Sequence, residues 1–539
     1  MSATFLPFDV VIKNGRVMDP ETNFDGVRNV GIIGGKIASI TTNDISGKET
    51  INAKGLVVCP GFIEGHVHGN DPFAFKALVR DGLTTAMDFE AGIGNVSGWY
   101  TRKQGKTQIN YGQVACAAFA RLAVLDGEDL AALGDDPAGI TTHILPAVGK
   151  RAKEEGRPMG WNATLPDKLQ MSQIMALLDD QLRQGALGIG VPVAYMTHGV
   201  TSYEMYKYQE LAGLYDRITN AHTRFSGVMP PASGALGIQE LLSNAMVLGA
   251  PTMIAHINST QDWEFTTDYV NKARNKAGAK VFAEAYPYHA ASTIGASDIL
   301  TKETMENMGM SVDKIYYVDP YQRWDDEIHA KRFEKPGSLV VFENNKEEDI
   351  WKWMKDPETL VCSDAMPVTD AAGETYPWDT PFEGKTCHPR TSGTRGKFLR
   401  MLREDLKDHV SLMTGIAKMA YLPAKYFEEI GGIPHFRTKG RLQEGCDADI
   451  VVLDPETVTD NSSYNVGEGM LPTTGIPYVL VNGTVVVKDS EVLPVFPGQP
   501  IRFPTMPKGK IDQLTVDPPF RPGMGKNTRH IEHLNLGCC

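Results

Sequence analysis

Between residues 60 and 430, short apolar runs alternate with amphipathic stretches, and this alternation limits the folds open to the chain. Runs such as GLTTAMDF, PTMIAHI and TLVCSDA read as buried strands, and stretches such as KLQMSQIMALLDDQLRQ repeat apolar residues with helical spacing. Because repeated strand–helix units with apolar strands form parallel sheets, the pattern predicts a distorted (β/α)8 barrel of the TIM type. A doubly wound open sheet is the alternative, but no glycine-rich phosphate-binding motif follows the first strand to favour it.

Strand-like runs also occur at both ends of the chain. DVVIKNGRVMD and RNVGIIGGKIASI near the start, and ADIVVLDPETV and IPYVLVNGTVVVKDSEV near the end, are β-rich and broken by Asn-Gly and Gly-Gly turns. We therefore predict a small β-sandwich domain assembled from both termini. The expected division is 1–58 and 431–500 for this domain, 59–430 for a metal-binding barrel with an insertion near 301–357, and 501–539 for a C-terminal extension.

Amino-acid composition and net charge indicate which kinds of binding partner and which cell compartment to expect. The 539 residues are 42% hydrophobic and carry a net charge of −13, which argues against nucleic acid and anionic membranes as partners. We expect a small-molecule substrate and allow for a homo-oligomer. No signal peptide or membrane-spanning run is evident, and the seven cysteines are dispersed, apart from the terminal pair, which favours reduced thiols in a cytoplasmic protein.

The first candidate site is the pair His66 and His68 in PGFIEGHVHGN. In an extended segment, alternate side chains point the same way, so one cation could be held by both. His-x-His alone is a weak signal, and two ordinary histidines in a turn are the competing interpretation. The pair therefore needs support from other strand ends, where barrel active sites are built.

Carboxylates end the next predicted strand, GLTTAMDFEAG. Asp88 and Glu90 share one face of it, and a carboxylate on a buried strand is costly unless it is paired or bound to a cation. Glu90, the last before the Gly92 turn, is the better-placed metal ligand, and Asp88 is the alternative or a buried hydrogen-bonding residue.

Three more residues follow apolar runs in the same way. His222 and His256 are 34 residues apart, which is one strand–helix unit, so we expect them at the same level on adjacent strands. Asp364 ends TLVCSDA and could be a metal ligand, a general base, both, or a helix N-cap. Together with His-x-His, these residues predict a metal site of histidines and carboxylates.

These motifs resemble those of the amidohydrolase superfamily, and within it the N-acyl-D-amino-acid deacylases, or D-aminoacylases. The similarity runs along nearly the whole chain. Its more specific cues are GLTTAMDFEAG, GALGIG, AEAYPYHAAST, SDAMP, HPRTSGT and MTGIAKMAYLPAKYF.

The resemblance implies a ligand set and a cofactor. It assigns the first metal pair to His66 and His68 and two further ligands to His222 and His256, and it makes Asp364 the catalytic aspartate, which we also place among the ligands. The implied cofactor is one or two Zn²⁺ ions, with another divalent metal as the alternative.

The resemblance also implies substrate contacts, with two departures. Arg390 matches an arginine that binds the substrate carboxylate, and Tyr286 or Tyr288 matches a substrate-contacting tyrosine. Asn258 stands where the family has a lysine that contacts this carboxylate, so the predicted pocket has lost a cation. Ala91 stands where the family has a bridging cysteine, a role that Glu90 could take from one residue earlier.

The predicted reaction is hydrolysis of an amide bond in an N-acyl-amino acid or related acylated amine. Bound Zn²⁺ lowers the pKa of its water to about 7, and Asp364 could act as general base and then general acid. A metal-dependent hydrolase of another substrate, such as a cyclic amide, a peptide or a bulky aromatic amide, is the alternative. GALGIGVPVAYMTH contains no lysine, which counts against the hydantoinase-like subgroup.

Overall fold

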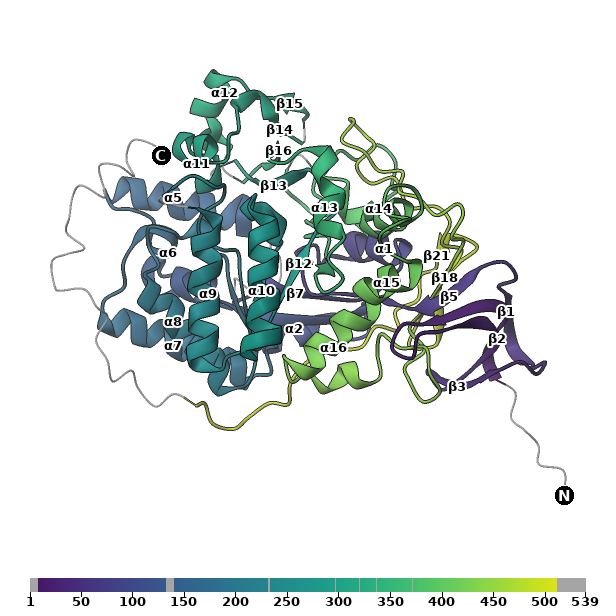
Figure 1. The fold of residues 1–539 in the computed structure, drawn as a ribbon. Coiled ribbons are helices and arrows are strands. Elements are labelled where there is room, and N and C mark those ends of the chain that lie inside the picture. The colour runs from purple at the N-terminus through teal and green to yellow at the C-terminus, as the bar shows by residue number, and fades with distance from the viewer. Residues whose placement is uncertain are drawn as a thin grey trace.

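A barrel of parallel strands forms the centre of the molecule (Figure 1). The computed structural model describes residues 8–131, 140–230, 233–295, 297–318, 320–335, 337–370 and 372–510. Neighbouring strands of the central sheet run parallel throughout. In sheet order they are β6 (Phe62–Glu64), β7 (Leu83–Ile93), β8 (Asn110–Cys116), β9 (Gly188–Val191), β10 (Ile218–Ala221), β11 (Thr252–Ile254), β12 (Val281–Ala285) and β17 (Leu360–Val361).

The barrel is nearly closed where the two ends of this sheet approach each other. His68 and Gly69, which follow β6, donate backbone hydrogen bonds of 2.8 and 2.9 Å to the carbonyl of Ala365, which follows β17. The predicted distorted (β/α)8 barrel is therefore confirmed, and the open doubly wound sheet is not.

Helices surround the barrel and follow the sequence pattern that predicted them. In α7 (Lys168–Arg183), Met171, Ile174 and Leu178 recur at helical spacing and are buried. The Asp167 carboxylate accepts a 2.8 Å hydrogen bond from the Gln170 amide, which completes a capping box at the helix start. The other helices that flank the strands are α1 (Pro72–Arg80), α2 (Val96–Lys103), α8 (Ser202–Leu214), α9 (Gly234–Leu248), α10 (Trp263–Ala277) and α14 (Arg390–Glu404).

Apolar side chains fill the barrel interior below the mouth. Met87, Phe282 and Met253 belong to one buried cluster with Phe427 of α16 (Leu422–Glu429). The Phe89 and Phe427 rings stack 5.2 Å apart. The interior below the mouth is thus a packed apolar core.

Strands from the N-terminal and C-terminal parts of the described chain meet in one nine-stranded sheet, which confirms the small β-domain. Strand β5 pairs antiparallel with β18, which joins the N-terminal and C-terminal strands. We call this sheet the terminal sheet; Figure 1 shows it beside the barrel. Its strands are β1 (Phe8–Asp19), β2 (Phe24–Ile33), β3 (Lys36–Thr41), β4 (Gly47–Asn52), β5 (Val57–Pro60), β18 (Ile450–Leu453), β19 (Tyr478–Val481), β20 (Thr484–Lys488) and β21 (Glu491–Val492).

A second, four-stranded antiparallel sheet lies in the excursion between β12 and β17. We call this excursion the insertion. Its strands are β13 (Ala290–Ile294), β16 (Leu339–Glu343), β14 (Ile315–Tyr317) and β15 (Gln322–Arg323), and its helices are α11 (Lys302–Asn307), α12 (Asp326–Ala330) and α13 (Ile350–Met354). Figure 1 shows it above one end of the barrel, where it can contribute to a cavity.

The first residues of the predicted C-terminal extension pack onto the barrel. The Ile501 amide donates to the Tyr111 carbonyl at 2.7 Å, and the Phe503 amide donates to the Gly185 carbonyl at 3.1 Å. Residues 511–539, with the terminal cysteine pair, lie outside the described residues. In the described part of the chain, no helix has both the length and the apolar character needed to cross a membrane.

Candidate metal centre and active site

The predicted metal ligands lie together at the carboxyl ends of the barrel strands. His66 and His68 follow β6, Glu90 lies near the end of β7, and His222 directly follows β10. His256 comes two residues after β11. Because parallel strands end at one rim, residues far apart in sequence meet there.

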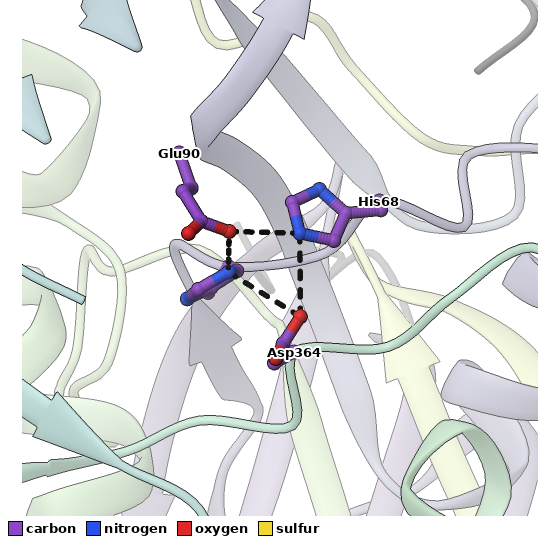
Figure 2. Close-up of side chains that lie close together, drawn as sticks. His68, Glu90 and Asp364 are labelled. Carbon is purple, nitrogen blue, oxygen red and sulfur yellow. Dashed lines mark hydrogen bonds and ion pairs between the residues drawn. The ribbon is translucent and has the colours of Figure 1, made fainter. Parts of the chain in front are cut away.

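One oxygen of Glu90 faces the His-x-His pair. Glu90 Oε2 lies 2.7 Å from His66 Nε2 and 3.0 Å from His68 Nε2. Asp364 Oδ1 approaches the same two nitrogens at 3.4 and 3.2 Å. Figure 2 shows Glu90, His68 and Asp364 pointing toward one another from three segments of the chain. Four potential ligand atoms therefore converge on one point.

The other oxygen of Glu90 faces the second pair of histidines. Glu90 Oε1 lies 2.7 Å from His222 Nδ1 and 3.3 Å from His256 Nε2. It is buried and makes no hydrogen bond of acceptable geometry with either ring. His222 and His256 follow the adjacent strands β10 and β11, as their spacing predicted. Glu90 is thus shared by two groups of donors, one on each side of its carboxylate.

Two further carboxylates hold the first histidine pair in place. His66 Nδ1 contacts Glu284 of β12, and His68 Nδ1 lies 3.0 Å from Asp88 Oδ2. Asp88 also accepts the backbone amides of Glu90 and Ala91, both at 3.0 Å. A carboxylate on the far ring nitrogen fixes the tautomer and orientation of a metal-binding histidine. Asp88 thus has the geometry of a hydrogen-bonding residue, and Glu90 that of the shared ligand.

Asp364 has an unusual backbone conformation that a buried glutamate supports. Its φ is +54°, which is uncommon for a residue other than glycine. Glu64 of β6 accepts hydrogen bonds from the amides of Ser363 and Asp364, at 2.5 and 3.2 Å, and is itself ion-paired with the buried Arg395. On the other side, Arg390 Nη1 lies 3.0 Å from Asp364 Oδ2.

The charges in the cluster keep its carboxylates ionised. Burial alone would raise the pKa of Glu90, but His66 and His222 hold that pKa well below its usual value. Burial likewise opposes ionisation of Asp364, and Arg390 with His66 outweighs it and lowers the pKa. Both carboxylates are therefore available as acceptors or ligands at neutral pH.

The donor set fits a divalent metal. Imidazole nitrogens and carboxylate oxygens are the ligand types of catalytic zinc, and these also accept other first-row ions. Within each group around Glu90, the candidate ligand atoms lie within 4.8 Å of one another. The buried Glu90 Oε1 accepts no regular hydrogen bond although His222 Nδ1 lies 2.7 Å away, and His256 Nδ1 has no hydrogen-bond partner. Buried polar atoms without regular hydrogen bonds cost free energy unless another group satisfies them.

A cavity of about 540 Å³ opens onto this cluster between the barrel rim and the insertion. That size is within the range of small-molecule sites. His68, Glu90, His222, His256 and Asp364 line one part of it. Tyr195, which the sequence reading did not single out, lines it as well, beside His222 at a ring distance of 5.2 Å.

The predicted substrate-contacting residues lie at different depths around the cavity. Tyr286 lines it, whereas the Tyr288 hydroxyl faces the Pro389 carbonyl at 3.5 Å. Arg390 and Asn258 are fully buried just behind the lining. No guanidinium nitrogen of Arg390 makes a regular hydrogen bond, and Asn258 Nδ2 is also without a hydrogen-bond partner.

The cysteines of the cavity wall are not activated nucleophiles. Cys116 and Cys387 both line the cavity, and burial raises the pKa of each thiol to about 12. A thiol with such a pKa stays protonated at neutral pH, and the thiolate is the nucleophilic form. This agrees with hydrolysis by water rather than through a covalent acyl-enzyme.

The chain is similar to curated deacylases along most of its length. It is 28% identical over 515 residues to N-acyl-D-glutamate deacylase of Alcaligenes xylosoxydans xylosoxydans, covering 89% of this chain and 93% of that protein. It is 26% identical over 495 residues to N-acyl-D-aspartate deacylase of the same organism, covering 87% and 90%. D-hydantoinase of Geobacillus stearothermophilus is 25% identical over 536 residues, covering 94% and 98%. No family model matches the chain.

Solved structures share the fold. The N-acyl-D-glutamate deacylase from Bordetella bronchiseptica, complexed with zinc and a phosphonate inhibitor, superposes with a TM-score of 0.70 at 21% identity, over 92% of this chain and 100% of that one. The chain thus resembles the D-aminoacylase-like amidohydrolases in sequence and in fold. A D-aminoacylase whose structure addresses its binuclear metal centre matches with a TM-score of 0.69 at 21% identity, over 92% and 100% of the two chains.

The curated proteins that the chain matches include deacylases, dihydroorotases and a D-hydantoinase, and one of the matching solved structures contains zinc. The sequence reading missed Glu64 and Glu284 as neighbours of the site. Their signal was present, because each is a single glutamate within an apolar strand run, in PGFIEG and KVFAEAY. Such a carboxylate is costly to bury without a partner.

Proposed function

We propose that this enzyme hydrolyses the amide bond of an N-acylated amino acid or a closely related acylated amine, with zinc as its metal. The observation that carries the proposal is the convergence of four histidines and Asp364 on the two oxygens of Glu90, at the floor of a cavity. The proposed ligands are His66, His68, Glu90, His222, His256 and Asp364.

Asp364 is the proposed general base and general acid. A divalent metal bound here supplies a water of lowered pKa and polarises the scissile carbonyl. The ionised Asp364 carboxylate faces the His66 and His68 nitrogens with Oδ1, so it can accept a proton from the attacking water. The same carboxyl then delivers that proton to the departing nitrogen.

Arg390 is the proposed carboxylate-binding residue. Its guanidinium lies against the Tyr286 ring, 5.7 Å from the centroid, and beside Asp364, two residues that line the cavity. Its guanidinium nitrogens make no regular hydrogen bond although the side chain is fully buried, and its one ion pair among the described residues is with Asp364. A guanidinium in this state favours a bidentate anionic ligand, and a carboxylate next to the scissile amide is such a group.

A substrate panel with metal analysis tests the proposal. Purified enzyme is assayed with N-acetyl-D- and N-acetyl-L-amino acids, with their carboxamides, and with five- and six-membered cyclic amides. We expect turnover of the free acids, weaker turnover of the carboxamides, and at least about one metal per chain in the same preparation. Hydrolysis of cyclic amides alone would overturn the N-acyl-amino-acid proposal in favour of a cyclic amidase.

Metal removal tests the cofactor. Dialysis against a chelator should abolish hydrolysis, and added Zn²⁺ should restore it, because the proposed reaction depends on a metal-bound water. Full activity in protein with a metal content close to zero would contradict the assignment.

A further inference from the structure

His388, two residues before Arg390, is a buried histidine outside the metal cluster. Its Nδ1 accepts a 3.1 Å hydrogen bond from the Arg390 amide, and its Nε2 lies 3.0 Å from the Ala290 carbonyl. Because Nδ1 needs a lone pair to accept an amide proton, the ring proton lies on Nε2, which donates to Ala290. Both nitrogens are therefore bonded to backbone groups, one on each side of the ring.

The surroundings of the His388 ring hold it in this orientation and in its neutral form. Tyr288 and Tyr464 contact the ring edge-to-face, at ring distances of 5.3 and 5.2 Å. Burial, and then the nearby Arg390 guanidinium, keep the pKa of His388 well below its usual value. A protonated ring would present an N–H to the Arg390 amide and lose that hydrogen bond. The neutral ring keeps both bonds.

The hydrogen bond to the Arg390 amide anchors the start of α14. Arg390 is the first residue of this helix, and Pro389 before it provides no side-chain cap. The first amides of a helix have no partner within the helix, so they need one from outside. His388 Nδ1 supplies that partner at the residue whose guanidinium lies beside Asp364 and the Tyr286 ring.

The direction of the Arg390 side chain depends on this anchor. Its guanidinium nitrogens make no regular hydrogen bond, and Asp364 is the one carboxylate with which it pairs among the described residues. Where the helix starts therefore largely decides where the guanidinium lies. On the other side of the His388 ring, Ala290 begins β13, and residues 291–293 of that strand line the cavity. His388 thus connects the arginine to a wall of the cavity.

We infer that His388 is a positioning residue, which holds the Arg390 guanidinium at a fixed place relative to β13. The inference rests on the proposed function, in which Arg390 binds the substrate carboxylate. A misplacement on the order of 1 Å can cost up to about 100-fold, because a bidentate contact requires aligned groups. His388 itself does not line the cavity. Its substitution should therefore weaken the binding of carboxylates and leave the turnover of bound substrate nearly unchanged.

Two substitutions separate the roles of the two ring nitrogens. In His388→Asn, the side-chain oxygen can still accept from the amide two residues later, as in an Asx turn, whereas the contact with Ala290 is lost. In His388→Gln, the longer side chain can still donate to Ala290, whereas the acceptor next to the Arg390 amide is lost.

Kinetics with an acid and its carboxamide test the inference. For the best N-acetyl-amino acid of the substrate panel, we expect KM to rise about tenfold in His388→Gln and less than about threefold in His388→Asn, with kcat within about threefold of the wild type in both. The KM of the matched carboxamide should change less than about threefold, since this compound has no anion for Arg390 to bind. An equal loss for acid and carboxamide, or unchanged KM values in folded His388→Gln protein, would overturn the inference and leave the proposed function standing.

His329→Gln is the matched control. His329 is also a buried histidine, and its Nε2 lies 2.8 Å from the backbone carbonyl of Leu300. It belongs to α12 and does not line the cavity. Its substitution should leave the acid-to-carboxamide ratio of kcat/KM at the wild-type value. A fall in this ratio like that of His388→Gln would show that the loss of any buried histidine has this effect, and the inference would fail.

Binding separates failure of the inference from failure of the proposed function. The N-acetyl-D- and N-acetyl-L-amino acids and their carboxamides are added at equal concentration to the zinc-loaded full-length protein, and the midpoint of thermal unfolding is measured. Stabilisation by an acid that is lost in His388→Gln and kept in His388→Asn supports the inference even if the wild type hydrolyses only cyclic amides, a result that would sink the proposed reaction. If no acid stabilises the wild type, the inference fails together with the assignment of Arg390.

Discussion

The barrel mouth and the terminal sheet differ in whether their buried polar side-chain atoms make hydrogen bonds. In the terminal sheet, the Asp449 carboxylate accepts hydrogen bonds from the Lys439 ammonium at 2.6 Å and the Asn482 amide at 2.7 Å. Among the described residues of its nine strands, no buried side-chain nitrogen or oxygen lacks a partner. At the barrel mouth, Glu90 Oε1 and the three guanidinium nitrogens of Arg390 make no regular hydrogen bond, although His222 lies 2.7 Å from Glu90 Oε1 and Asp364 lies 3.0 Å from Arg390 Nη1. Satisfied groups fix a structure, whereas buried groups without partners mark the place where a ligand is expected.

The backbone repeats this contrast. Left-handed residues in the terminal sheet include Asn14, Asn23 and Asn482, at φ of 63°, 55° and 47°, which is a conformation that asparagine tolerates in turns. At the barrel mouth the left-handed residues are His256 and Asp364, at φ of 22° and 54°. Aspartate tolerates this region as asparagine does, but the φ of His256 lies outside the usual left-handed range, so the surrounding contacts must maintain its strain. The comparison teaches that activity and stability depend on different regions, which substitutions can test.

The largest effect is expected at Asp364. Asp364→Asn removes the proposed base and acid while it preserves the shape of the side chain, so kcat should fall by roughly 10²- to 10⁴-fold. The midpoint of thermal unfolding, measured on the same preparation, should fall as well, because the buried Arg390 loses the carboxylate of its ion pair. Turnover near that of the wild type would show that another group transfers the proton. Asp370→Asn, on the exposed edge of the cavity, is the control.

A substitution at Glu64 should affect both activity and stability. Glu64→Gln weakens the contact that holds the Ser363 and Asp364 amides, so kcat should fall by roughly 10- to 100-fold with little change in KM. It also leaves the buried Arg395 with Asp81, at 3.9 Å, in place of its close partner, and loss of one partner of a buried ion pair typically costs about 3 to 5 kcal/mol of stability.

A double substitution separates these two consequences. Glu64→Gln with Arg395→Met removes the unpaired charge and should recover most of the unfolding free energy without recovering kcat. If kcat returns together with stability, Glu64 acts only through the fold and does not position Asp364.

Much of the site was predictable because each ligand follows an apolar strand. His66, His222 and His256 could be placed at one rim from strand spacing alone, since parallel strands end together. Tyr286 and Tyr288 could not be separated, because period two gives both the same face and the chain leaves β12 at Ala285. In the structure, only Tyr286 lines the cavity.

Contacts between distant segments were the part that the sequence could not provide. Which carboxylate meets the second nitrogen of His66 depends on how β12 lies across from β6, and no local pattern encodes that distance. The same holds for Glu64 and Arg395, which are 331 positions apart. The size of the cavity depends on how the insertion packs, which is again set by tertiary contacts. The strands of the barrel and the terminal sheet, in contrast, follow from local alternation and turns.

A substitution at Lys439 tests the other region of the comparison, the terminal sheet, where we expect an effect on stability and not on activity. Lys439→Met leaves Asp449 and Asp447 without their buried cation, so the unfolding free energy should fall by about 3 kcal/mol while kcat stays near the wild-type value. Burial alone would lower the pKa of Lys439, but Asp449 and Asp447 outweigh it and raise the pKa.

The sign of this shift predicts a pH dependence. Because the pKa is higher in the folded state, the stabilisation is fully present below the unfolded value of about 10.4 and is lost as pH rises through the folded pKa. Denaturant unfolding at pH 7 and above pH 10.4 should therefore show the difference between wild type and variant shrinking at the higher pH. A difference that grows with pH would contradict the ion-pair explanation.

The smallest effect is expected at Asn23, in the exposed turn between β1 and β2. Asn23→Ala puts a residue that disfavours the left-handed region at φ of 55°, so stability should fall by about 1 kcal/mol. Asn23→Gly relieves the strain and should have an effect near zero, because greater freedom of the unfolded chain offsets the gain. Both variants should retain wild-type kcat, measured beside their unfolding curves. A loss of kcat in either would mean that the terminal sheet communicates with the barrel mouth, and the division between the two regions would then be wrong.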